Sequence, residues 1–238
     1  MFSYFSILPV HFKKEDDLSN PTVLASMLFF LPLGGLLLGS ISITLYLLLA
    51  PLAWLGALIA AIAYMMLYGF LHTEAIMDVA DALYAKHSGT DAYAVMKEPT
   101  VGAMGVLWAV GMLLLKVGGI LFLFLHGAYV LFLSILLISR LALLVLFFTH
   151  TFRSTFITQM QKGFSKPYFF SSFILFTLIG TTLSSWHFIL LLAIGVLFAY
   201  LLAHVLKIKL GFINGDVLGT ILESSEIVLF ILGARLWL

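Results

Sequence analysis

The chain has 238 residues, of which 63% are hydrophobic and only 10% are charged, and its formal net charge is +1. A soluble domain is about 45–50% apolar and about 25% charged, so this composition excludes a soluble globular protein and indicates a polytopic membrane protein. The near-zero net charge gives no support for a nucleic-acid partner, and the absence of cysteine excludes disulfides, thiolate metal sites and a cysteine nucleophile.

Seven apolar runs are long enough to cross a membrane, since a helical span needs roughly 20 mostly apolar residues. Before them, residues 1–22 begin with a short apolar run that has no basic segment in front of it, so we interpret them as an interfacial segment. No polar stretch is long enough for a soluble domain, so residues 1–238 are predicted to form a single all-α, integral membrane helical bundle. The predicted spans are 23–48, 51–71, 101–124, 127–148, 167–184, 187–206 and 218–237, and the first two can also be divided differently.

The connections between these spans differ sharply in charge. The N-terminal segment and the loops 72–100, 149–166 and 207–217 lie on one side and carry nine Lys and Arg residues, whereas the opposite turns carry none. Because positively charged loops stay in the cytoplasm, the basic side is predicted to face the cytoplasm. The acidic residues form three groups, near the N-terminus, in the segment 72–100 and near the C-terminus, and all three groups lie on or next to that side.

The densest group of acids lies in the segment 72–100. Glu74, Asp78 and Asp81 stand at i, i+4 and i+7, which places them on one face of a helix. Such stacked charges repel unless a cation lies among them, and hard oxygen ligands favour Mg²⁺, Mn²⁺ or Ca²⁺. We therefore predict a divalent-cation site, with a solvated acidic helix as the alternative. His72 is a candidate metal ligand, phosphate contact or acid–base group, and can equally cap the preceding span.

A second motif runs from Met96 to Gly105. Lys97 and Glu98 directly precede a predicted helix N-terminus, which is a natural site for an anion. Gly102 and Gly105 permit close approach by a backbone or a phosphate, although glycines three residues apart in a membrane helix often serve only packing.

The last group of acids lies near the C-terminus. Asn-Gly-Asp at 214–216 predicts a turn. Glu223 and Glu226 follow inside a span, where a carboxylate is costly unless it is paired or faces a cavity. Pairing and direct catalysis are both compatible with the sequence. The candidate partners are Lys207, Lys209 and Arg140, and a buried arginine such as Arg140 either pairs or meets an anion.

Together these motifs resemble those of the cobalamin-5′-phosphate synthase family, also called adenosylcobinamide-GDP ribazoletransferase, over nearly the whole chain. Residues 72–82 follow the family pattern His-x-Asp-Gly-x-x-Asp-x-x-Asp-Gly, residues 96–105 follow Met-Lys-Asp-x-x-x-Gly-x-x-Gly, and residues 214–220 follow Thr-Gly-Asp-x-x-Gly-Ala. Every acidic position keeps its charge, so we expect an active enzyme. The departures are Glu74 and Glu98 for aspartate, Ala75 and Ala82 for glycine, and Asn214 for threonine.

The resemblance implies that adenosylcobinamide-GDP reacts with α-ribazole 5′-phosphate, or α-ribazole, to give adenosylcobalamin 5′-phosphate, or adenosylcobalamin, and GMP. It also implies Mg²⁺, which can neutralise the phosphate oxygens in such a transfer, and a place in the last stage of cobalamin biosynthesis. The predicted metal ligands are Glu74, Asp78, Asp81 and Glu98, the catalytic candidates are His72, Asp78, Asp81 and Glu98, and the predicted substrate contacts are Lys97, Gly102, Gly105, Arg140, Arg153 and Asp216.

The predicted location is the cell inner membrane, with the site facing the cytoplasm. The predicted partners are the two substrates, the lipid bilayer, and a second copy of the chain or other corrinoid-assembly enzymes. A divalent-cation transporter is one alternative, but it should spread its acids through several spans. A non-catalytic corrinoid-assembly homologue should have lost ligand charge. A lipid CDP-alcohol phosphotransferase should carry the motif Asp-x-x-Asp-Gly-x-x-Ala-Arg, which this chain lacks.

Overall fold

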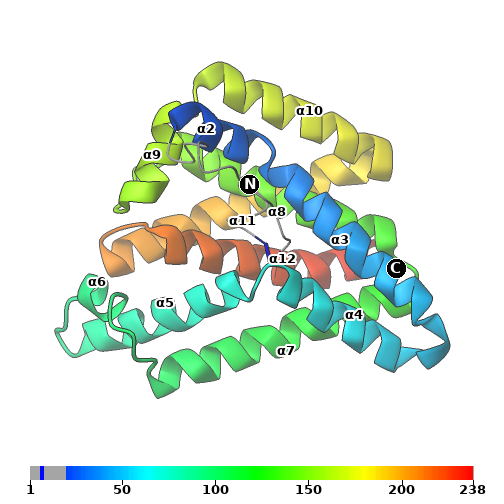
Figure 1. The fold of residues 1–238 in the computed structure, drawn as a ribbon, viewed down its shortest axis with the longest axis horizontal. Helices are drawn as coiled ribbons and strands as arrows, with labels where there is room; N and C mark the ends of the chain where they lie inside the picture. Colours follow the sequence, from blue (N-terminus) through cyan, green and yellow to red (C-terminus); the bar gives the residue numbers. More distant parts are fainter. Residues whose placement is uncertain (1–5, 8–19, 238) are drawn as a thin grey trace, which may run out of the picture.

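Helices make up almost all of the structure. The computed structural model describes residues 6–7 and 20–237, and these contain helices and no β-strand (Figure 1), which confirms the predicted all-α fold. Of the predicted interfacial segment 1–22, residues 1–5 and 8–19 lie outside the described residues, and its last two residues belong to the first described helix. The helices are α2 (Pro21–Phe29), α3 (Leu31–Leu48), α4 (Trp54–Leu67), α5 (Leu71–His87), α6 (Ala92–Val95), α7 (Ala103–Leu125), α8 (Tyr129–Thr149), α9 (Thr155–Gly163), α10 (Lys166–Ser184), α11 (Trp186–Leu210) and α12 (Gly215–Trp237), with a 3₁₀ turn at Ala50–Leu52.

Six helices of the described chain are long and apolar enough to cross a membrane, namely α3, α7, α8, α10, α11 and α12. The bent pair of α4 and α5, whose axes meet at 76°, can count as a seventh crossing. The structure is therefore that of a multi-pass membrane protein, as predicted from the apolar runs.

Two of the predicted spans differ in the structure. The run 23–48 divides at Phe30 into α2 and α3, because Pro32 lacks the N–H that a continuous helix needs and its ring clashes with the preceding turn. The run 51–71 gives only the 14-residue helix α4. The chain then turns abruptly into α5, because Gly69 and Phe70 both adopt positive φ, a conformation that ends a right-handed helix.

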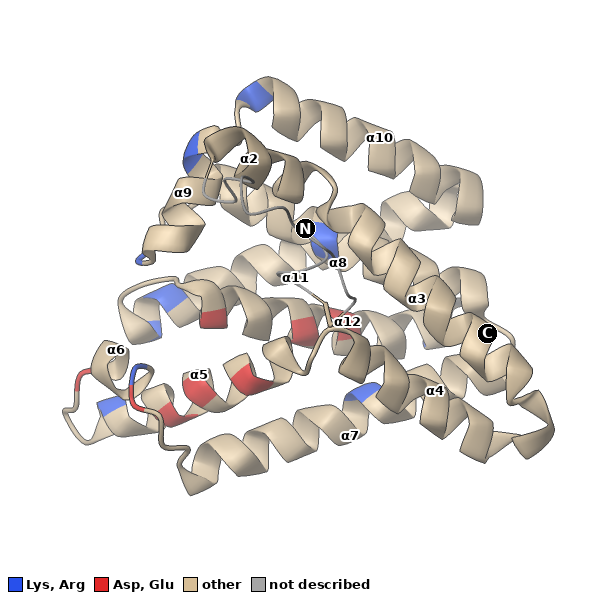
Figure 2. Ribbon diagram, viewed as in Figure 1, with Lys and Arg blue, Asp and Glu red and all other residues tan. Residues whose placement is uncertain are grey.

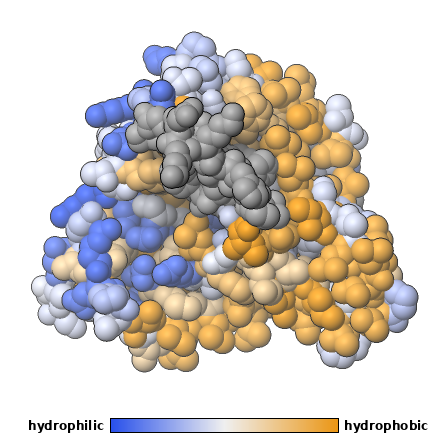
Figure 3. Space-filling view, viewed as in Figure 1, coloured by the Kyte–Doolittle hydropathy of each residue, from blue (hydrophilic) through white to orange (hydrophobic). Residues whose placement is uncertain are grey.

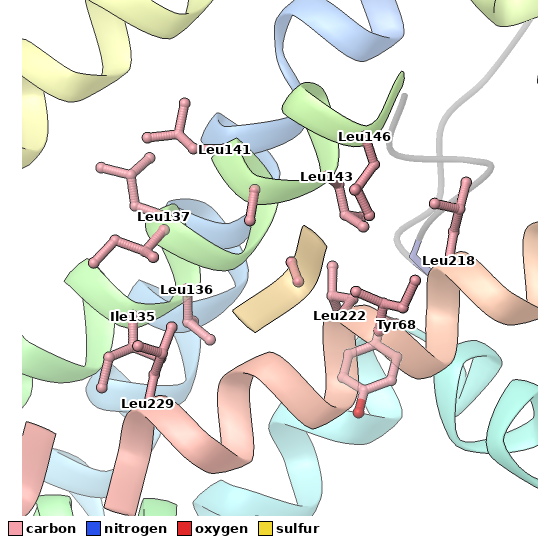
Figure 4. Close-up of a cluster of buried hydrophobic side chains, with 14 of the residues drawn as sticks. Tyr68, Ile135, Leu136, Leu137, Leu141, Leu143, Leu146, Leu218, Leu222 and Leu229 are labelled. Carbon is pink, nitrogen blue, oxygen red and sulfur yellow. The ribbon is translucent and has the colours of Figure 1, made fainter. Parts of the chain in front are cut away.

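Helix α8 lies at the centre of the bundle. In its most apolar stretch 83% of the residues are buried, against 22% in α7, whose outer side is left for lipid. α8 contacts α3, α10, α11 and α12. Figure 4 shows Ile135, Leu136 and Leu137 of α8 in the buried cluster, together with Leu229 of α12. Van der Waals contact of this kind is what associates helices within a bilayer.

The two ends of the bundle differ in polarity. The connections from α5 to α7, from α8 to α10 and from α11 to α12 lie at one end, where most Lys and Arg positions gather (Figure 2). The face drawn in Figure 3 is hydrophilic at this end and hydrophobic toward the other. Large apolar side chains such as Leu107, Leu114 and Leu178 are exposed around the bundle, as expected for a surface that meets lipid. We call the hydrophilic end the polar end.

Helices α5 and α12 approach each other closely at Gly219. A β-carbon on Gly219 would lie 2.8 Å from the β-carbon of Ala75. The hydroxyl of Thr220 also donates a hydrogen bond of 3.1 Å to the carbonyl oxygen of Ala75. Small residues at such crossings allow two membrane helices to pack almost backbone to backbone. This contact holds the acidic helix α5 against the N-terminal half of α12.

Gly219→Ala should destabilise the protein by about 1–3 kcal/mol, because extra volume in a tight contact forces the backbones apart. Gly118→Ala in α7 is the matched control, since nothing lies within 4 Å of its added β-carbon. Thermal unfolding in detergent should give a lower midpoint for Gly219→Ala, and an unchanged or higher midpoint for Gly118→Ala because alanine favours a helix. Equal midpoints would contradict the close contact.

Candidate functional site

Glu74, Asp78 and Asp81 lie on one helix, α5, as predicted. Glu74 is exposed and Asp78 and Asp81 are half-buried, so all three keep access to solvent at one side of the helix. The small residues beside them face the protein and are buried, namely Ala75, Val79 and Ala82. Figure 2 shows acidic positions along α5 and along α12, two helices that contact each other.

Asp78 is the centre of the acidic group. The negative charges of Asp216, Glu74 and Asp81 act on its carboxylate and repel it, with Asp216 the strongest of the three, while the positive charge of Lys97 attracts it. Asp216 comes from the first turn of α12, far along the chain from α5. The fold thus brings together acids from two motifs that the sequence only showed separately.

Asp81 connects α5 to the start of α7. Its two carboxylate oxygens accept hydrogen bonds from the backbone N–H groups of Gly102 and Gly105, at 2.6 and 2.7 Å. These donors belong to a helix N-terminus, where N–H groups lack partners within the helix and the dipole favours an anion. A β-carbon at either glycine would lie within 3 Å of the Asp81 carboxylate. The helix N-terminus that the sequence suggested for an anion thus holds a carboxylate of the same chain, and substrate contact by Gly102 and Gly105 stays a prediction.

Lys97 and Arg153, two of the predicted substrate contacts, both lie against the aromatic ring of Tyr93. The guanidinium of Arg153 lies 3.8 Å from the ring centroid of Tyr93, and the Lys97 ammonium lies 5.6 Å from it. Phe212 meets the same ring edge-on, with 5.2 Å between centroids. The backbone N–H of Arg153 donates to the carbonyl oxygen of Ile213 at 2.8 Å. Tyr93 thus joins three connections of the polar end, a role that no motif in the sequence indicated.

A cavity of about 320 Å³ lies next to the acidic group, between α3, α5, α8 and α12. Half of its lining residues are Leu, Ile or Phe, so its wall is mainly apolar. His72, Arg140 and Asp216 are among the polar residues of the wall. Asp216 thus belongs to the cavity wall, and its charge also acts on Asp78 of α5.

Below the cavity lies a cluster of four buried charges, which we call the buried ion cluster: Lys116, Arg140, Glu223 and Glu226. Lys116 Nζ is 2.6 Å from Glu223 Oε2 and 2.8 Å from Glu226 Oε2, and Arg140 pairs with Glu226 Oε1. Each of the four is at most 4% exposed. Two positive and two negative charges cancel, as a membrane interior requires.

Further side chains border this cluster, and one of them is Ser139, whose hydroxyl donates a hydrogen bond of 3.1 Å to Glu226 Oε1. The hydroxyl of Tyr68 accepts a hydrogen bond from Lys116 at 3.1 Å, and that of Tyr64 accepts one from Arg140 at 3.0 Å. His72 Nδ1 lies 3.7 Å from Glu223 Oε1, and neither atom has a hydrogen-bond partner among the residues that the structure describes. His72 therefore stands between the cluster and the cavity.

The ion pairs of Glu223 and Glu226 on α12 agree only in part with those that the sequence suggested. Arg140 is a partner, as the sequence allowed, but Lys207 and Lys209 are exposed at the end of α11 and pair with neither Glu223 nor Glu226. Their place is taken by Lys116, a residue to which the sequence alone assigned no role. A mid-span lysine is itself the signal that could have indicated this pairing, because a buried ammonium needs a carboxylate.

The remaining predicted ligand, Glu98, is exposed in the turn before α7, and its charge is not among those that act on Asp78. Among residues 6–7 and 20–237, no group of three His, Asp or Glu side chains is close enough to hold a metal ion by itself. Mg²⁺ usually takes one or two protein carboxylates and completes its shell with water and substrate phosphate. The Mg²⁺ site therefore stays a prediction.

Comparisons with known proteins match this chain to one family. The family model described as cobalamin-5-phosphate synthase matches residues 1–234. The adenosylcobinamide-GDP ribazoletransferase of Brevibacillus brevis is 30% identical over 209 residues, which cover 86% of this chain and 84% of that protein. The proteins of the same name from Chlorobium chlorochromatii and Clostridium perfringens are 28% and 29% identical, over 97% and 94% of this chain and 92% and 91% of theirs. No solved structure matches.

Lys116→Met should destabilise the protein by about 3–5 kcal/mol, because it leaves two buried glutamates with one cation. The double variant Lys116→Met/Glu223→Gln removes one charge of each sign and should recover most of that loss. Lys209→Met, at an exposed lysine, is the control and should leave stability unchanged. The measurement is denaturant unfolding in detergent micelles, and a single variant as stable as Lys209→Met would show that the cluster is not energetically coupled.

Proposed function

The chain belongs to the cobalamin-5-phosphate synthase family, and we propose that it is an adenosylcobinamide-GDP ribazoletransferase acting on adenosylcobinamide-GDP and α-ribazole 5′-phosphate. One observation carries the proposal. Asp216 of the last acidic motif lines a cavity that is large enough for part of a substrate, and its charge acts on Asp78 of the first acidic motif. A functional site needs such convergence of polar groups on a concave, largely apolar surface.

The proposed reaction is a phosphoryl transfer. A ribose hydroxyl oxygen of α-ribazole 5′-phosphate forms a bond to the phosphorus attached to the aminopropanol arm of the corrinoid. The bond from that phosphorus to the bridging diphosphate oxygen breaks, GMP leaves with the bonding electrons, and the hydroxyl proton passes to a base. His72 lines the cavity, and Asp78 is acted on by the charge of Asp216, which also lines it, so His72 and Asp78 are the candidate bases.

The donor set around Asp78 fits Mg²⁺. Glu74, Asp78 and Asp216 supply only hard carboxylate oxygens, and the repulsion that Glu74 and Asp216 exert on Asp78 would be relieved by a divalent cation. Both oxygens of Asp81 already accept backbone hydrogen bonds, so we assign to Asp81 the positioning of α7 against α5. When bound, Mg²⁺ would neutralise charge on the diphosphate.

The cations at the polar end suit the phosphate groups of the substrates. Lys97 and Arg153 lie against the ring of Tyr93 at the same end of the bundle as the acids, and we propose that they bind the diphosphate as a pair. Arg140 lines the cavity, but its guanidinium is bonded to Glu226, Ser139 and Tyr64. For Arg140 we therefore propose a structural role in place of the phosphate contact expected from the sequence.

We propose that the polar end faces the cytoplasm across the inner membrane. The basic residues of the connecting loops gather at this end, and loops rich in Lys and Arg stay on the cytoplasmic side. Charged, phosphorylated substrates would reach the acids directly from the aqueous phase there, without crossing hydrocarbon.

The alternatives are less well supported by the same observations. A cation transporter would need free carboxylates in mid-membrane, yet Glu223 and Glu226 are both bonded to buried cations. A non-catalytic homologue should have lost ligand groups. The departures from the family pattern at Ala75 and Ala82 instead fall on buried packing positions of α5, where a methyl group contributes to helix contact.

Asp78→Asn should lower GMP release by at least about 100-fold, since it removes a charge from the proposed reaction centre. Asp91→Asn is the matched control: Asp91 caps α6 by accepting from the Tyr93 N–H at 3.0 Å, and asparagine caps a helix equally well. Purified protein in liposomes would receive both substrates over a range of Mg²⁺ concentrations, and GMP and the corrinoid product would be measured together.

Two results would count against the proposed function. An Asp78→Asn protein as active as Asp91→Asn would remove Asp78 from the reaction centre. Wild-type protein that binds adenosylcobinamide-GDP but releases no GMP would indicate the non-catalytic homologue instead.

A further inference from the structure

We propose that the apolar cavity binds the base and ribose of the nucleoside acceptor, and that its width between α8 and α12 limits the size of the base. The corrinoid substrate would then stay outside, over the acids of the polar end. This inference rests on the proposed function, because that function supplies the acceptor, α-ribazole or its 5′-phosphate.

The volume of the cavity decides which of the two substrates can enter it. The cavity volume of about 320 Å³ lies at the lower end of the roughly 300–1,000 Å³ found for small-molecule sites. A base with its ribose suits such a volume. A corrin macrocycle with its amide side chains, its adenosyl ligand and an attached GDP is several times larger. Only the smaller substrate can enter the cavity as a whole.

The chemistry of the wall separates the acceptor base from guanine. Leu143 of α8 and Leu218 and Leu222 of α12 line the cavity. Guanine carries N–H and carbonyl groups on its edges, and burial of such a group without a partner costs about 1–3 kcal/mol. The base of the acceptor α-ribazole is a benzimidazole, whose outer edge carries only carbon and needs no hydrogen-bond partner. The wall therefore favours the acceptor base over the guanine of the donor.

The polar residues of the cavity wall determine which end of the nucleoside would face the acids. Asp216 lines the cavity and its charge acts on Asp78. The side-chain amide of Asn214 donates a hydrogen bond of 2.7 Å to Asp216, which holds that carboxylate in place. With the base among the leucines, the ribose would lie toward Asp216. Its hydroxyl groups would then meet the acids of α5, where the diphosphate of the donor is expected.

Leu143 is the position at which binding of the acceptor base in the cavity can be tested. It is buried, at 7% exposure, and Figure 4 shows it on α8 near Leu222 of α12, with Tyr68 beyond. A larger side chain at Leu143 would reduce the cavity without changing any charged group. Val130 lies on the same helix but is 42% exposed, so Val130→Trp is a control that adds a large side chain outside the cavity.

Binding of α-ribazole, without phosphate or Mg²⁺, would be measured by equilibrium dialysis against wild type, Leu143→Trp and Val130→Trp in nanodiscs. We expect Leu143→Trp to weaken α-ribazole binding at least tenfold and Val130→Trp to leave it unchanged. Binding of adenosylcobinamide-GDP should be the same in all three proteins. A tenfold loss of corrinoid binding in Leu143→Trp, or undiminished α-ribazole binding, would overturn the inference.

Leu143→Ala provides a second test that does not depend on tolerance of tryptophan. It should improve binding of an acceptor whose base carries a third fused ring, relative to α-ribazole, by about tenfold. An unchanged preference would overturn the size limit. These binding results are independent of turnover, so GMP release by the wild type tests the proposed function separately: a protein that binds α-ribazole in this way but makes no product would refute the reaction and not the cavity.

Discussion

The buried ion cluster is the constraint on which the rest of the structure depends. Lys116, Arg140, Glu223 and Glu226 come from three helices and lie where water cannot solvate them, so each charge needs its partners. Apolar helices in lipid can slide or rotate against one another at little cost, because lipid is as apolar as leucine. A set of four paired charges removes that freedom and fixes α7, α8 and α12 in one relative arrangement.

That arrangement determines what the polar end can do. Asp216, Gly219 and Glu223 recur at i, i+3 and i+7 of α12 and therefore share one side of the helix. Once Glu223 is bonded to Lys116, the same side of α12 presents Gly219 to Ala75 and Asp216 to Asp78. The cavity lies directly above the cluster, with Arg140 and His72 in its wall. Stability in the membrane and assembly of the candidate site are thus the consequence of one set of contacts.

The acids of α5 divide into two kinds according to their partners. Both carboxylate oxygens of Asp81 accept hydrogen bonds from the N-terminus of α7. This explains the two glycines of the second motif, because a side chain at either position would clash with the Asp81 carboxylate. Asp78 is left among like charges, and of the described residues whose charges act on it Lys97 alone attracts it. A helix face with one acid committed to structure and another in an unfavourable field is what a site that binds a cation or a phosphate-bound metal would require.

The sequence by itself determined the class of protein, the polar end and the helix that carries the acids. Apolar length, loop charge and the spacing of Glu74, Asp78 and Asp81 are local properties, and the structure confirms the helix and the spans that follow from them, except where Pro32 and the bend at Gly69 divide two runs. Only the tertiary structure decided which distant groups meet. The hydrogen bonds of Asp81 with Gly102 and of Lys116 with Glu223 join residues far apart in the chain, and so does the charge of Asp216 acting on Asp78. No periodicity records such pairs, because they depend on how whole helices are rotated and packed.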